Sequence, residues 1–155
     1  MIVSAIQNVV SQMSMECSFI YGLKGWQNLQ ADKTAVFPVI FLDEPISSID
    51  NFSQGGAVDI TYNLNIAFLT KSNLSWSAAQ QDVVIQAMRN VRREFILRLK
   101  KIADTSTNQH LFRSISNITT LNAVNIFDVN LSGVLVSFQV VPMSSDGICL
   151  AVSAT

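Results

Sequence analysis

The longest regular pattern of apolar and polar positions runs from Ser77 to Ala103 and has the period of an α-helix. Ser77 and Gln80 stand three residues apart, as in a capping box, where each side chain satisfies a backbone N–H of the first turn. Spacings of three and four predict one core-facing row, formed by Val84, Met88, Val91, Phe95, Leu99 and Ile102. The opposite face is polar and carries Asp82, Gln86, Arg89, Arg93 and Lys100.

Three further apolar residues of this helix lie outside the core-facing row. Ile85 and Ile96 fall on one flank, and Leu97 lies beyond the polar stripe on the other. An apolar arc of this width favours a helix that contacts a second surface besides its own core. Single apolar residues are also common on protein surfaces, so incidental exposure is an equal alternative.

A second strong pattern covers residues 57–70, where apolar and polar residues alternate with the period of a β-strand. We expect the alternate residues Val58, Ile60, Tyr62, Leu64, Ile66 and Phe68 to face the core. We expect Asp59, Thr61, Asn63 and Asn65 to face outward.

The rest of the N-terminal half gives weaker signals. Helical spacing predicts an amphipathic helix over residues 1–14, followed by an irregular connection over 18–34 in which Tyr21 and Trp26 anchor the chain. Residues 36–42 are apolar and β-rich, but Pro38 lacks a backbone donor, which favours an edge strand or the beginning of a strand. Residues 43–54 read as a loop that extends as an arm.

The C-terminal half predicts a hairpin. Residues 111–119 are weakly extended and 121–129 form a strand, after which 131–133 turn the chain into a strand over 134–140 that Pro142 ends. Residues 143–155 form a tail without periodicity, a second candidate arm. The element order predicts a single α+β domain over 1–155, with a small, mostly antiparallel sheet and two helices packed on one face.

Composition adds an expectation about association. Of the 155 residues, 49% are hydrophobic and only 14% are charged, so few charges protect the surface from contacts with other copies, and we expect an oligomer. The formal net charge of -1 argues against general nucleic-acid binding. No apolar run is long enough for a membrane helix, and the N-terminus is a poor signal peptide, so we expect no membrane association. Cys17 and Cys149 read as free thiols, with a disulfide between them as the lesser alternative.

The sequence offers little catalytic chemistry. His110 is the only histidine and reads as a surface loop residue, and Asp43-Glu44 is an adjacent pair whose side chains point apart on an extended chain. Metal-binding, nucleotide-binding and nucleophile motifs are missing from the sequence. We therefore expect no enzyme, no catalytic residue, no cofactor and no metal.

Charge is concentrated in the long helix. Six of the ten Lys and Arg residues lie within thirteen positions, namely Arg89, Arg92, Arg93, Arg98, Lys100 and Lys101. A solvated face favoured by the helix dipole is the simpler interpretation. The alternative is contact with an acidic neighbouring subunit or with DNA, for which Arg89, Arg93, Arg98 and Lys100 are the candidate residues. Arg98 falls at the margin of the apolar face and should extend to solvent or pair.

Four stretches resemble the tail terminator, or tail completion, proteins of long-tailed bacteriophages. They are FPVIFLDEPISS at 37–48, VDITYNLNIAFLTK at 58–71, DVVIQAMRNVRREFILRLKK at 82–101 and NIFDVNLSGVLVSFQVVP at 125–142. The resemblance covers about residues 37–141 and consists of fold and turn patterns rather than catalytic signatures. Other head–tail connector and ring adaptor proteins share this architecture.

The resemblance implies a structural virion protein. It implies a homo-oligomeric ring, usually hexameric, assembled in the host cytoplasm at the head-proximal end of a phage tail. The implied partners are further copies of the chain, the tail tube protein and the head–tail connector or adaptor, with genomic DNA passing through the lumen. A connector ring with a different copy number is the alternative. A small enzyme or ligand-binding domain with a pocket against the sheet is a third, less favoured class.

Overall fold

The computed structural model describes residues 2–22, 36–52, 58–102, 110–126 and 130–143. Within these ranges the helices are α1 (Ile2–Ser11) and α3 (Ala78–Lys101). The strands are β1 (Ser18–Tyr21), β2 (Val39–Leu42), β3 (Ser47–Phe52), β4 (Val58–Lys71), β5 (Phe112–Ile126) and β6 (Leu131–Pro142).

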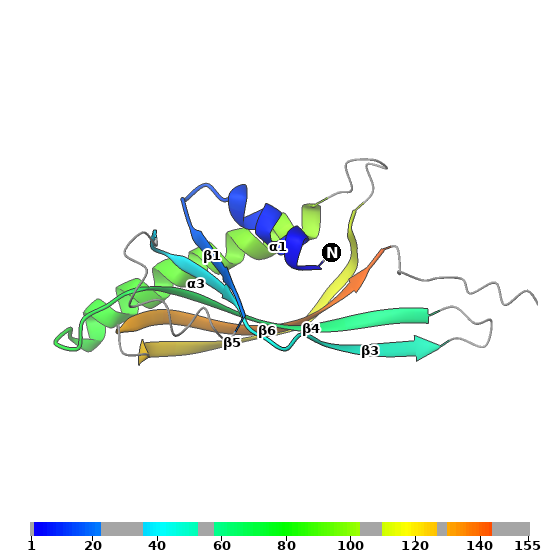
Figure 1. Ribbon diagram of the computed structural model, residues 1–155. Helices are drawn as coiled ribbons and strands as arrows, with labels where there is room; N and C mark the ends of the chain where they lie inside the picture. Colours follow the sequence, from blue (N-terminus) through cyan, green and yellow to red (C-terminus); the bar gives the residue numbers. More distant parts are fainter. Residues whose placement is uncertain (1, 23–35, 53–57, 103–109, 127–129, 144–155) are drawn as a thin grey trace, which may run out of the picture.

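One six-stranded sheet, in the order β1-β2-β4-β6-β5, carries the fold, and β3 pairs with β4 beside this path. β1 and β2 are parallel, and the other pairs are antiparallel. Both helices lie on the same face of the sheet (Figure 1). The predicted α+β class, with a mostly antiparallel sheet and two helices on one face, is confirmed. No helix in the described ranges is long and apolar enough to cross a membrane.

The long helix begins as the sequence predicts and packs across the centre of the sheet. Ser77 is its N-cap, and the reciprocal capping box with Gln80 is present. Phe95 is fully buried and meets Phe68 of β4 edge-to-face, with ring centroids 5.3 Å apart. Aromatic pairs favour this geometry, which adds to the free energy gained by burial. The main core therefore forms between α3, β4 and β6, with α1 packed beside them.

The buried row of α3 differs from the prediction in its first turns. Ile85 is buried and Val84 is only half-buried, so Ile85 takes the place in the row that was expected for Val84. Its first member is polar: Gln81 is buried and donates to the backbone oxygen of Asn73, while its own oxygen accepts from Ser132. A buried amide with both ends bonded is tolerated in a core, and an apolar pattern cannot reveal it.

The predicted register of β4 is confirmed in its central part. Leu64, Ile66 and Phe68 are buried on the helix side, and Asn65 is exposed on the other side. Near the end of β4 both faces of the strand carry buried apolar side chains. Those on the face opposite the helices belong to a second hydrophobic cluster. It consists of Val39, Phe41, Ala67, Leu69 and Leu131.

Two predicted loops contain strands. Residues 18–21, expected to be irregular, form β1 along β2, so β2 is internal and β1 is the edge strand. Pro38 directly precedes β2, in agreement with a strand beginning. Residues 47–52, expected to be part of a loop, form β3 and pair with β4. All six side chains of β3 are exposed, which explains why no hydrophobic period marks it.

The C-terminal hairpin is longer than predicted. Residues 112–126 form one strand, whose register shifts near Asn117 and Asn125, both in the left-handed region. The predicted turn at 131–133 is the start of β6. Gly133 lets β6 lie close to Phe68 of β4 and Met88 of α3. A Cβ added at this position would lie 1.9 Å from the Phe68 backbone oxygen and 3.0 Å from Met88 Cγ. Trp26, Cys149 and the tail from 144 onward lie outside the described residues.

The Phe95–Phe68 contact predicts the outcome of a truncation. Phe95→Ala should lower the free energy of unfolding by about 3–5 kcal/mol, because it leaves a cavity in the centre of the main core. Urea unfolding at one fixed protein concentration measures this. Val83→Ala is the matched control, since Val83 is 70% exposed on the same helix, and it should change stability by less than about 0.5 kcal/mol. A loss below about 1 kcal/mol for Phe95→Ala would contradict the packing described.

Candidate functional site

The four candidate basic residues of α3 do not converge on one point. Arg89 donates from Nη2 to Asn122 Oδ1 of β5 at 2.7 Å, and Arg98 Nε pairs with Glu94 Oε1 at 2.9 Å. Arg93 and Lys100 are exposed, and no ion pair joins either to another residue in the described ranges. Arg98 thus pairs, as its position at the margin of the apolar face required. The other three lie on the solvent side of the helix or reach toward β5.

Glu94 joins α3 to the segment that follows α1. Its carboxylate accepts from the backbone N–H and the hydroxyl of Ser14, each at 2.8 Å, and from Arg98. The bonds from Ser14, followed by those from Arg98, hold the pKa of Glu94 below its ordinary value. Burial and the nearby Glu94 charge raise the pKa of the Cys17 thiol, which disfavours the reactive thiolate form.

A shallow groove runs along the exposed side of the last three turns of α3, and we call it the α3 groove. Its lining combines three basic side chains with one acid, one amide and one apolar side chain: Arg93, Arg98, Lys101, Glu94, Asn90 and Leu97. Leu97 is 52% exposed, although it is a large apolar residue. Of the flanking apolar residues noted in the sequence, Ile85 is buried and Ile96 packs against the core, so only Leu97 is available to a second surface.

The sheet face opposite the helices, which we call the open face, carries a polar ladder across four strands. Asn117 of β5 donates to Gln139 of β6, Gln139 donates to Asn63 of β4, and Asn63 donates to Ser47 of β3. The three donor–acceptor distances are 2.7, 2.9 and 3.1 Å. None of these side chains is charged, so this band can form hydrogen bonds with a partner without the desolvation cost of an ion.

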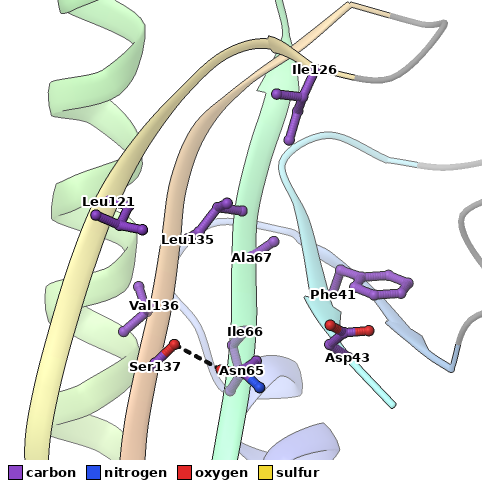
Figure 2. A pocket seen from close by; sticks show the side chains of 10 residues that line it. All are labelled: Phe41, Asp43, Asn65, Ile66, Ala67, Leu121, Ile126, Leu135, Val136 and Ser137. Carbon is purple, nitrogen blue, oxygen red and sulfur yellow. Dashed lines mark hydrogen bonds between the residues drawn. The ribbon is translucent and has the colours of Figure 1, made fainter. Parts of the chain in front are cut away.

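An apolar hollow of about 300 Å³ lies beside the ladder on the open face. Phe41, Ala67, Leu121, Leu135 and Ile126 supply most of its apolar lining, as Figure 2 shows. Its polar rim contains Asp43 and Asn65. Asn65 Oδ1 accepts a hydrogen bond from the Ser137 hydroxyl at 2.7 Å. Leu121 is 61% exposed and Leu135 is 36% exposed, which leaves apolar area available to a ligand or a neighbouring protein.

Another candidate surface is a two-stranded ribbon formed by β3 and residues 58–61 of β4. β4 pairs with β6 over Tyr62–Lys71 and with β3 over Val58–Asn63, so its first four residues pair with β3 alone in the described register. The ribbon extends beyond the part of the sheet that the helices cover (Figure 1). Phe52 is 73% exposed and Ile49 is 50% exposed. An isolated two-stranded ribbon is only marginally stable in water, so the ribbon is a candidate contact surface.

The residues considered for chemistry are dispersed. His110 is exposed, Cys17 is half-buried and free, and Asp43 lies at the rim of the hollow, where it accepts from the Glu44 backbone N–H. Within the described ranges, no three His, Cys, Asp or Glu side chains are placed to hold a metal ion.

Sequence patterns missed the ribbon and most of the ladder. Asn63 was expected to face outward, but its partners depend on the pairing of β3 and on the register shifts of β5, which no local pattern encodes. The pair of large apolar residues Ile49 and Phe52 within the polar segment SSIDNF was the available signal.

No family model matches this chain, and no curated protein sequence matches it significantly.

The bonds to Glu94 generate a pH-dependent prediction. Glu94→Gln should lower the free energy of unfolding at pH 7 by about 0.5–1.5 kcal/mol, because it weakens charge-assisted hydrogen bonds at a partly exposed site. The pKa of Glu94 is lowered in the folded state. The stabilisation is therefore complete above the unfolded-state pKa and is lost as the pH falls through the folded-state value.

Urea unfolding of both proteins at pH 7 and at about pH 3 measures this difference. The gap between the two proteins should shrink at the lower pH. Glu16→Gln is the control, since Glu16 is exposed and no ion pair joins it to a described residue, and it should leave the gap near zero at both values. An equal gap at both pH values for Glu94→Gln would contradict the assignment.

Proposed function

We propose that this protein is a structural virion protein that forms a homo-oligomeric ring, most simply of six subunits, at the head-proximal end of a phage tail. In this proposal the ring caps the tail tube and joins it to the head connector, and DNA passes through its lumen. The ring is assembled in the host cytoplasm and becomes part of the virion. The chain performs no catalysis, and its partners are its own copies, the tail tube protein and the connector.

The observation that carries the proposal is the ribbon. All six side chains of β3 are exposed, including Ile49 and Phe52, and within the described ranges no strand pairs with its edge away from β4. A protein that acted alone would be expected to cover or shorten such an edge, because free edges pair with other chains. A ring subunit uses such a surface for contact with its neighbours.

Two further features support the proposal. The chain has 14% charged residues, and its open face combines an uncharged polar ladder with an apolar hollow. Surfaces of this kind desolvate at low cost when subunits meet. A ring arises when two different patches of identical subunits meet head-to-tail and the rotation closes.

The competing functions differ in their assembly state. A connector or adaptor ring elsewhere in the virion would show another copy number. A small ligand-binding domain would use the hollow around Leu121 and Leu135 and would stay monomeric.

Electron-microscope class averages of the purified protein, together with light scattering over a dilution series, test the proposal. We expect closed rings with six-fold symmetry that dissociate on dilution. Closed rings with another symmetry would support the connector alternative. A monomer at high concentration would contradict the ring and would favour the ligand-binding class.

A further inference from the structure

The two faces of the ribbon differ in chemistry. Asn63 donates to Ser47 on the open face. Because side chains of a strand alternate, Ile49 shares that face, and Asp50 and Phe52 lie on the opposite one. Both Asp50 and Phe52 are exposed. This side of the ribbon, which we call the Asp50–Phe52 face, thus presents an acid and an aromatic ring two residues apart.

The α3 groove offers the complementary chemistry. Arg93 and Leu97 stand one helical turn apart on its lining, and Arg98 and Lys101 border them. The acid in the groove, Glu94, is already engaged by Ser14 and Arg98. The groove therefore carries an excess of positive charge beside an exposed apolar side chain.

The charge distribution along the chain reinforces this match. Residues 43–60 contain four acids and no Lys or Arg, whereas residues 89–101 contain six basic residues and one acid. The acids are Asp43, Glu44, Asp50 and Asp59, of which Asp59 pairs with Arg113 at 3.0 Å. Opposite charge on two separate patches favours their contact and fixes its orientation.

The spacing also agrees. Residues two apart on a strand are about 6.7 Å apart along its axis, and residues four apart on a helix are about 6 Å apart along its axis. Asp50 and Phe52 can thus meet Arg93 and Leu97 at the same time when the strand lies along the helix. The ribbon extends away from the helices in its own subunit (Figure 1), so the two surfaces are available to different copies.

We infer that the Asp50–Phe52 face of one copy docks in the α3 groove of a second copy. Asp50 pairs with Arg93, and Phe52 covers Leu97. The contact joins two different patches, so it is head-to-tail and repeats around a closed ring. This inference rests on the proposed function, since it names the surfaces through which the ring forms.

Charge reversal tests the pairing. Asp50→Lys and Arg93→Glu should each raise the concentration at the midpoint of assembly by at least about tenfold, because each places like charges in contact. Light scattering over a dilution series measures the midpoint. Thermal unfolding of each variant checks that the subunit is folded, and Lys101→Glu replaces Arg93→Glu if that variant is unfolded.

Mixing the two variants gives the decisive result. In an equimolar mixture the reversed ribbon of the Asp50→Lys variant meets the reversed groove of the Arg93→Glu variant. The unchanged ribbon of the Arg93→Glu variant meets the unchanged groove of the Asp50→Lys variant. Both contacts are then complementary, so the mixture should assemble as alternating rings with a midpoint near that of the wild type. Lys100→Glu and Asp82→Lys are matched reversals on the same helix, outside the groove lining, and should leave the midpoint within about twofold.

The outcomes separate the inference from the proposed function. If wild-type rings form but the single variants assemble normally, or the mixture does not recover assembly, the docking is wrong and the ring proposal stands. If the wild type is monomeric at every concentration, both fail. Loss of assembly in each single variant, with recovery on mixing, supports both.

Discussion

The edge-to-face contact between Phe95 of α3 and Phe68 of β4 holds the long helix across the centre of the sheet. Both rings are fully buried. Gly133 lets β6 approach the Phe68 backbone at this point, and Met88 fills the remaining space above it. Because both helices lie on this face, the apolar residues there are covered within one subunit. Neither of the two described helices covers the opposite face or the ribbon.

That asymmetry links the fold to the proposed assembly. Glu94 fastens the segment after α1 to α3 through Ser14, and Arg93 and Lys101 have no ion pair among the described residues. Within the ribbon, residues 58–61 of β4 pair with β3 and not with β6 in the described register. In the proposed assembly, a second copy supplies further contacts to the ribbon.

The sequence predicted those elements whose own apolar side chains recur at the regular spacing of a helix or a strand. The capping box at Ser77 and the alternation of Leu64, Ile66 and Phe68 are local signals, and both were confirmed. β3 was missed because its six exposed side chains have no period, and its existence depends on pairing with β4. Gly133 was taken for a turn residue, because the close approach that requires it comes from distant Phe68. The candidate basic residues were found by charge alone, but the groove that two of them, Arg93 and Arg98, line depends on how α3 is rotated on the sheet.

Amide hydrogen exchange of β3 tests most directly whether a second copy covers the ribbon. Exchange at Ser47–Phe52 would be compared between a concentrated, assembled sample and a dilute, dissociated one, with β6 as the internal reference. We predict that β3 gains protection on assembly while β6 does not change, because β6 is already paired with β4 and β5 within the subunit. Equal protection of β3 in the two samples would contradict it.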